Sequence, residues 1–186
     1  ASSAVEHEHV VKLLGYFEEP SLGAVLEWTD GYTALGGPPS FESITRDTYP
    51  EGTAFAKAFV ERAACGIAAA AAHLHARSMC HGDLYAHNIL VRPSGDAKLG
   101  DFGAAFYYAD SPHAERFQQM EVRSFGHLLE ELVVRLGAED ASSSSDWVAR
   151  MTELSRACTG PAARRPSFQQ LAARLALGPN GSCSYA

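Results

Sequence analysis

Apolar positions predict two short strands near the N-terminus and one long helix after them. Val10–Gly15 and Ala24–Trp28 are apolar runs on either side of the turn signal Glu-Pro-Ser-Leu-Gly, so we expect a small antiparallel pair. Residues 31–50 are rich in Gly, Pro, Ser and Thr and predict a loop with at most a short helical turn. Over Thr53–Arg77, apolar side chains recur at helical intervals with alanines between them, which predicts a long core helix.

The following segment predicts a hairpin and a second helix. Ile89–Val91 and Ala97–Leu99 are short apolar runs around the turn residues Arg-Pro-Ser-Gly-Asp, which is typical of a β-hairpin. Glu121–Leu136 carries a broad apolar face at helical spacing and predicts a helix packed on a core.

The C-terminal part predicts two more helices. The Ser-rich stretch Ala141–Ser145 indicates a surface loop. Apolar side chains recur at helical spacing over residues 147–158, and Pro166 occupies the expected first position of a last helix. From Gly178 onward we expect a frayed tail. The order of two strands, a long helix, a hairpin and further helices indicates an α+β fold that is mainly helical.

Composition limits the possible functions. The chain has 186 residues, of which 46% are hydrophobic, so it can form a real core and amounts to one domain or part of one. Its 22 acidic and 15 basic residues give a net charge of −7. Because a nucleic-acid backbone requires a basic face, this balance argues against nucleic acid as a partner.

Targeting signals are not evident in the sequence. The most apolar long stretch, Phe55–Leu74, carries Lys, Glu, Arg and His side chains and therefore does not predict a membrane span. Ala1–His9 lacks the basic-then-apolar pattern of a signal peptide. The four cysteines show no two-residue pairing, so we expect independent thiols in a reducing compartment and a cytoplasmic location.

Three polar residues are expected to meet around the hairpin. Asp83 and Asn88 lie in the loop before its first strand, and Asp101 lies in a turn after its second strand. Because a hairpin brings its ends together, these residues should surround one small volume. Mg²⁺ prefers oxygen ligands, so we expect Asn88 and Asp101 to hold it and Asp83 to accept a hydroxyl proton. This is the chemistry of phosphoryl transfer.

The joint pattern resembles the protein kinase superfamily. His81–Asn88 reads His-Gly-Asp-Leu-Tyr-Ala-His-Asn, and Leu99–Gly103 reads Leu-Gly-Asp-Phe-Gly after the hairpin. Ser-Phe-Gly at 124–126 and Arg-Arg-Pro-Ser-Phe at 164–168 also resemble later elements of the family. The similarity is to the C-terminal lobe of a protein-kinase-like domain, in a compact bacterial or algal type.

The resemblance implies a domain organisation and two cofactors. Residues 1–28 are expected to be a remnant of an N-terminal-lobe sheet that runs into the hinge. Residues 29–178 would form the kinase-like C-terminal lobe with its catalytic-loop hairpin, and residues 179–186 a flexible tail. The resemblance implies that ATP and Mg²⁺ bind, with Asp83 and Asn88 as catalytic residues and Asn88 and Asp101 as metal ligands.

Nucleotide contacts follow from the same resemblance. Leu26 stands at the gatekeeper position, and the backbone of Glu27 and Thr29 would hydrogen-bond adenine. Leu90 would lie under the adenine ring.

Five further residues are implied as structural support for the site. His81 and Phe102 would stack in the apolar spine below the site. Gly103 closes the turn after Asp101. Glu121 replaces the Asp that normally holds the catalytic-loop backbone, and Arg165 belongs to the late Arg-Pro element.

The departures from the family pattern concern phosphate binding. No Gly-x-Gly-x-x-Gly loop and no Val-Ala-Ile-Lys-like strand precede Val10, and Lys12 falls in the wrong strand to replace the missing Lys. An N-terminal lobe or upstream domain is therefore expected to be missing from this chain, leaving an exposed apolar surface. Gly82 and Tyr85 replace an Arg and a phosphate-contacting Lys. His87 either supplies a donor near Tyr85 or is an ordinary loop histidine.

The activation segment is expected to be short. Only 17 residues, 104–120, separate Gly103 from Glu121, and they contain no Ala-Pro-Glu. Glu115 is a candidate partner for Arg164 or Arg165, with an ordinary surface salt bridge as the equal alternative.

Three functions follow from these features. The first is a protein-kinase-like transferase that moves the ATP γ-phosphate to a Ser or Thr hydroxyl. The second is a small-molecule phosphotransferase similar to aminoglycoside or choline kinases, which often carry His-Gly-Asp. The third is an inactive, pseudokinase-like binding module. The expected partners are ATP and a protein or small hydroxyl-bearing substrate, with no nucleic acid and no membrane span.

Overall fold

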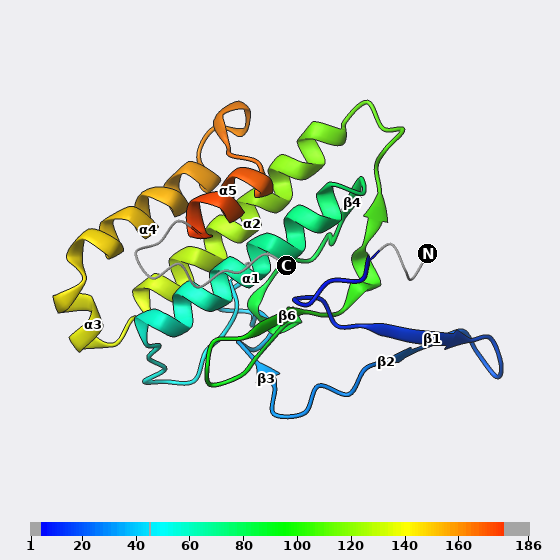
Figure 1. Cartoon of the computed structure of the whole chain (residues 1–186), viewed down its shortest axis with the longest axis horizontal. Coiled ribbons are helices and arrows are strands. Elements are labelled where there is room, and N and C mark those ends of the chain that lie inside the picture. The colour runs from blue at the N-terminus through cyan, green and yellow to red at the C-terminus, as the bar shows by residue number, and fades with distance from the viewer. Residues whose placement is uncertain (1–4, 45, 177–186) are drawn as a thin grey trace.

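The computed structural model describes residues 5–44 and 46–176. The helices are α1 (Lys57–His75), α2 (Ala114–Val134), α3 (Ala138–Ser143), α4 (Ser145–Thr159) and α5 (Phe168–Ala176). The strands are β1 (Leu13–Phe17), β2 (Gly23–Leu26), β3 (Thr33–Ala34), β4 (Met79–Cys80), β5 (Ile89–Val91), β6 (Ala97–Leu99) and β7 (Phe106–Tyr107). Helices pack together on one side of the molecule, and the small sheets that contain β1, β2, β3 and β6 lie along the other (Figure 1). The fold is α+β and mainly helical, as the sequence predicts.

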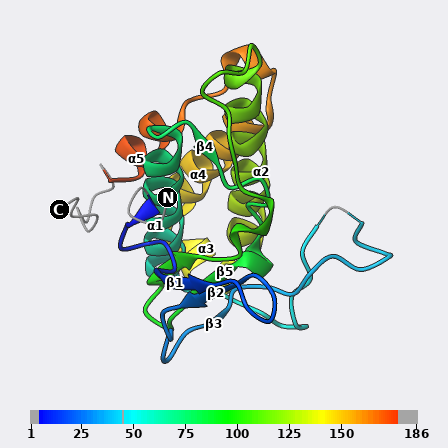
Figure 2. The same ribbon diagram turned by 90° about the vertical axis from the view of Figure 1, so that its right-hand side faces the viewer.

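Helix α1 forms the centre of the core because its alanines let neighbours approach on several sides. Val60, Ile67 and Leu74 are each at most 1% exposed, and most of the alanines between them are equally buried. A Cβ at Gly66 would lie 2.7 Å from the His9 ring, so this position admits the N-terminal segment against the helix. Helices α1 and α2 run side by side, and strands gather at one end of the pair (Figure 2).

The predicted hairpin forms with the expected strands. β5 pairs with β6 antiparallel, with Ile89 opposite Leu99, and β3 adds to the other edge of β5. The two-residue strand β3 was not predicted, because it lies inside the Gly- and Pro-rich loop and carries no strand pattern of its own.

The first two predicted strands also pair, but at shifted positions. β1 begins at Leu13 because the residues before it pair with β6 instead: the Leu99 N–H donates to the His9 carbonyl, and the Val11 N–H to the Leu99 carbonyl. β1 and β2 then form a separate two-stranded sheet. Large apolar side chains are exposed on this sheet and just after it: Leu14, Tyr16, Phe17, Leu22, Val25, Leu26 and Trp28.

Tertiary contacts move the helix ends. The predicted start of α1 at Thr53 is wrong, because Phe55 forms a bridge with Leu136 and its N–H donates to the Arg135 carbonyl. α1 begins at Lys57, whose N–H donates to the Asp140 carboxylate at 2.8 Å.

Two other helix predictions are corrected. α2 begins at Ala114 rather than Glu121, because its first turns pack Phe117 edge-to-face on Phe106. The last helix begins at Phe168 rather than Pro166.

The Ser-rich stretch is helical rather than a loop as far as Ser143. The hydroxyls of Ser142 and Ser143 donate to the Glu139 carbonyl, which supports the short helix α3.

Cys65 is disulfide-bonded, so the expectation of four independent thiols is wrong for this residue, whereas Cys80 and Cys158 are free and buried.

Within residues 5–44 and 46–176, no helix combines the length and the apolarity that a bilayer crossing requires. The predicted flexible tail, residues 179–186, lies outside the described residues.

The contact between α2 and α4 depends on Gly126. A Cβ at this position would lie 2.6 Å from the Cβ of Cys158 and 2.9 Å from Cγ2 of Thr159. We expect Gly126→Val to lower the free energy of unfolding by about 2 kcal/mol, because neither helix backbone can move away cheaply. Gly15→Val is the matched control, since nothing lies within 4 Å of its added Cβ. Equal stability of the two variants in chemical denaturation would contradict this packing.

Candidate active site

His81 joins the start of the loop His81–Asn88, which we call the catalytic loop after its place in the kinase pattern, to the end of the hairpin. Its Nε2–H donates to the Gly100 carbonyl at 2.7 Å, and its Nδ1 accepts the Asp83 N–H at 3.3 Å. The ring is fully buried and meets Phe102 edge-to-face, with centroids 4.8 Å apart. One tautomer of the imidazole satisfies both hydrogen bonds, so His81 fixes the loop relative to the Asp-Phe-Gly turn. The expected contact with Phe102 is present, but the rings meet edge-to-face rather than stacked.

The backbone at position 82 leaves no room for a side chain, so only glycine fits there. Its φ is +81°, and a Cβ would collide with the Ala104 carbonyl oxygen. The Gly82 N–H donates to Oε1 of Glu121 at 2.8 Å, and Oε2 of Glu121 accepts from His75 at 2.7 Å. Glu121 therefore holds the catalytic-loop backbone from α2, as the resemblance implies, and both of its oxygens are engaged.

Asp83 and Asn88 contact one another directly. The Asn88 Nδ2 donates to the Asp83 carbonyl at 2.9 Å and to the Asp83 Oδ2 at 2.8 Å. Asn88 is buried in the 3₁₀ turn Ala86–Asn88, whereas Asp83 is half-buried. The amide is thus oriented with its oxygen turned away from Asp83. Neither this oxygen nor the Asp83 Oδ1 has a hydrogen bond within the described part of the chain.

Asp101 stands at the other end of the hairpin. Its φ is +49°, and its Oδ1 accepts the Gly103 N–H at 3.1 Å, which shapes the turn. The side chain is exposed. The Gly100 N–H donates to the Asn88 carbonyl at 2.9 Å, so the two hairpin ends meet as predicted. This bond places Asp101 one residue beyond the contact with Asn88.

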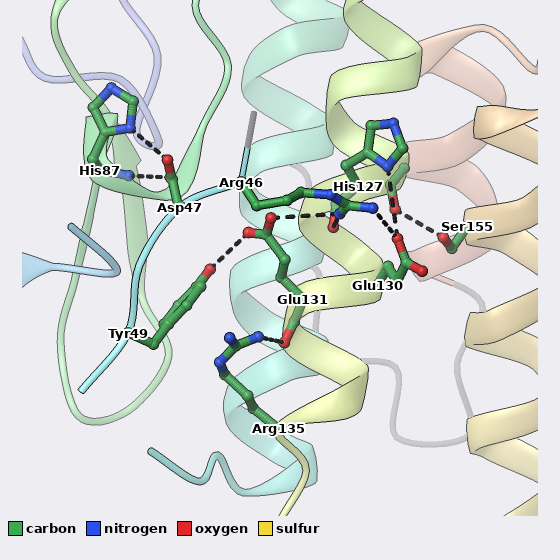
Figure 3. Close-up of polar contacts among 10 residues, drawn as sticks. Arg46, Asp47, Tyr49, His87, His127, Glu130, Glu131, Arg135 and Ser155 are labelled. Carbon is green, nitrogen blue, oxygen red and sulfur yellow. Dashed lines mark hydrogen bonds and ion pairs between the residues drawn. The ribbon is translucent and has the colours of Figure 1, made fainter. Parts of the chain in front are cut away.

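Sequence reasoning missed Asp47, which lies beside the catalytic loop (Figure 3). Its carboxylate accepts the His87 backbone N–H at 2.8 Å and the His87 Nδ1–H at 2.9 Å. The Asp47 side chain is fully buried, and the His87 Nε2 lies 3.8 Å from Oδ2 of Asp83. His87 is therefore a positioned residue between two carboxylates. No local pattern indicates a role for Asp47, because it lies in an irregular loop, 40 residues before His87.

The loop that carries Asp47 is fixed to α2. Arg46 contacts Glu130 at 2.6 Å and Glu131 at 3.5 Å, and the Tyr49 hydroxyl donates to Glu131 at 3.0 Å (Figure 3). Arg135 covers the Tyr49 ring at 3.8 Å. Burial raises the pKa of Glu131, although Tyr49 and Arg46 act in the opposite direction.

The four residues expected to contact adenine differ in how far they are exposed. Leu26 is 51% exposed, while Thr29 and Leu90 are half-buried. The Glu27 N–H donates to the Lys12 carbonyl, and its carboxylate contacts Lys98 at 2.7 Å. The hydrogen bond from Lys98 is the main cause that lowers the pKa of Glu27.

A cavity of about 730 Å³ lies between the β1–β2 sheet and the Asp-Phe-Gly turn. Leu26, Asp101, Phe102 and Gly103 line it, together with Lys12, which pairs with Glu6. These four are the expected site residues that line it, Lys12 not being one of them. Asp83, Asn88 and the remaining adenine-side residues do not line it.

Arg165 has backbone partners rather than an acidic one. Its guanidinium donates to the carbonyls of Gly160 at 2.9 Å and Gln119 at 2.8 Å. Glu115, the candidate partner, accepts from the Gln119 side chain instead, because both residues lie one turn apart on α2. That pairing prediction is wrong.

Comparison with known proteins agrees with this geometry. The family model for the protein kinase domain matches residues 1–150. The serine/threonine-protein kinases GRIK1 and GRIK2 of Arabidopsis thaliana are each 29% identical over 112 residues, which cover 57% of this chain and 25% and 24% of theirs. The mitogen-activated protein kinase kinase MKK2 of Pyricularia oryzae is 26% identical over 113 residues, 59% of this chain and 20% of its own.

The chain spans about a quarter or less of the length of these curated relatives. The family match covers most of the chain, and it includes the catalytic loop, the hairpin and the Asp-Phe-Gly turn. The chain belongs to the protein kinase domain family.

Proposed function

We propose that this chain supplies the catalytic loop of a kinase that transfers the γ-phosphate of ATP to a Ser or Thr hydroxyl. The observation that carries the proposal is the Asp83–Asn88 contact, which orients two side chains at once. With Oδ2 held by Asn88, the Oδ1 of Asp83 is left to face an acceptor hydroxyl. Asp83 would accept the hydroxyl proton while the acceptor oxygen bonds to the γ-phosphorus and ADP leaves.

The oxygen donors near the hairpin ends fit Mg²⁺. The Asn88 amide oxygen and the exposed Asp101 carboxylate are hard ligands of the kind that this ion takes, with water and phosphate completing the shell. The chemistry that Mg²⁺ would supply there is neutralisation of the phosphate charge of ATP. Asn88 and Asp101 would hold the ion, and the bond between Gly100 and Asn88 keeps their backbones together.

The adenine side of the proposal rests on Leu26, Glu27, Thr29 and Leu90. The Glu27 N–H is already used by Lys12, so its carbonyl is the group left for adenine. The Thr29 N–H has no hydrogen bond within the described residues and would be the matching donor.

The names of the relatives favour a protein acceptor over a small molecule, since all three are named as protein kinases. The His-Gly-Asp sequence is the feature shared with small-molecule phosphotransferases, but Gly82 is required here by its close approach to Ala104. We also propose a cytoplasmic location. The free thiols of Cys80 and Cys158 suit a reducing compartment, although Cys65 is disulfide-bonded.

Asp83→Asn tests the proton acceptor. We expect the full-length protein to lose about a hundredfold or more in kcat, because Asn cannot take the hydroxyl proton, while ATP binding is retained. Transfer from γ-labelled ATP to Ser peptides and to small hydroxyl acceptors gives the rates and separates the two acceptor classes. Asp96→Asn, in the exposed hairpin turn, is the control. Undiminished transfer by Asp83→Asn would remove Asp83 from the mechanism.

Asp47→Asn tests the support of His87. We expect kcat to fall about tenfold, because the amide cannot hold the His87 ring as the carboxylate does and His87 lies beside Asp83. Asp140→Asn is the matched control: this carboxylate also accepts a backbone N–H, at the start of α1. If both variants lose activity equally, the effect is general destabilisation and the positioning role of Asp47 is wrong.

A further inference from the structure

A second cavity, of about 440 Å³, lies between the catalytic loop and the first half of α2. Gly82, Leu84 and Tyr85, which flank Asp83 in the chain, form one of its walls. Arg123 and Arg165 also line it. The cavity is therefore next to the loop that carries the proposed proton acceptor, and it shares no lining residue with the Asp-Phe-Gly cavity.

The two arginines of this cavity have no acidic partner among the described residues. Arg123 is exposed and has no hydrogen bond or ion pair in that part of the chain. Arg165 uses two of its donors on the carbonyls of Gly160 and Gln119, which orient the guanidinium. Burial lowers the pKa of Arg165, and the charge of Arg123 lowers it further, so the two cations act on one another.

Nearby carboxylates are already engaged. Both oxygens of Glu121 are taken, by the Gly82 N–H and by His75. Glu115 accepts from Gln119. Arg46 and Lys98 are paired with glutamates elsewhere in the chain. Arg123 and Arg165 differ from the other unpaired arginines because both line one cavity, whose acidic lining residue, Glu121, is already engaged.

We propose that this cavity binds an acidic side chain of the acceptor polypeptide, a carboxylate or a phosphate close to the Ser or Thr that receives the γ-phosphate. Guanidinium groups recognise both anions through paired hydrogen bonds. Phe106, Phe117 and Met120 supply apolar walls for the stem of such a side chain. The inference rests on the proposed kinase function, because the acceptor must lie beside Asp83.

The first arm of the test measures binding without catalysis. Labelled Ser peptides flanked by Glu, phosphoserine, Gln or Lys are titrated with the full chain, and fluorescence anisotropy gives the Kd. We expect the Glu and phosphoserine peptides to bind tightest, with affinity that weakens as salt is raised. Arg123→Glu should weaken their binding about tenfold and improve binding of the Lys peptide, whereas Arg123→Lys should retain most of the acidic preference.

Arg150→Glu is the matched control, because Arg150 is also an exposed arginine of a helix but lies on α4, away from this cavity. Equal binding of acidic and neutral peptides, or equal behaviour of Arg123→Glu and Arg150→Glu, would overturn the inference.

The second arm measures phosphate transfer to the same peptides, and we expect the acidic flank to lower KM. Acidic binding through Arg123 without any transfer would support the inference and contradict the kinase function. Transfer that ignores the acidic flank would support the kinase function and overturn the inference.

Discussion

Two hydrogen bonds at Gly100 hold the catalytic loop against the turn that carries Asp101. The Gly100 N–H donates to the Asn88 carbonyl at 2.9 Å, and its carbonyl accepts from the buried His81 ring at 2.7 Å. One residue between β6 and the Asp-Phe-Gly turn thus contacts both ends of the catalytic loop. Because both bonds are shielded from water, they are stronger than exposed ones and set the spacing of the polar side chains around them.

The helical part acts as the frame for this loop. Glu121 reaches from α2 to the Gly82 backbone, and Asp47 reaches from an irregular loop to His87. That loop is itself bound to α2 through Arg46 and Tyr49. The residues that would do chemistry are therefore supported by buried carboxylates from segments far away in sequence, an arrangement that preorganises them before any ligand arrives.

The sequence patterns predicted the elements that depend on residues close together in the chain, such as the hairpin and the body of α1. The turn residues predicted both β5 and β6, and the loop before this hairpin brings Asp83 and Asn88 into contact, with Asn88 bonded to the Gly100 backbone. The alanine spacing gave α1 but not its start, because Phe55 instead pairs with the end of α2.

Contacts between residues far apart in the sequence could not be predicted from local patterns. Asp47 was missed because its role depends on His87, 40 residues away. The expected partner of Arg165 was wrong because Glu115 and Gln119 satisfy one another within α2. A role for Arg123 could not be predicted from the sequence, because it depends on the fold, which places Arg123 in the same cavity as Arg165 without an available carboxylate.

We infer that the two ends of the hairpin form one metal–nucleotide site. Paramagnetic broadening of amide NMR signals by Mn²⁺-ATP tests it directly, and it detects weak as well as tight binding. We expect the Asn88 and Gly103 signals to broaden together, only when ATP is present, while Ser142 on α3 does not change. Broadening of either site alone, or of neither, would contradict it.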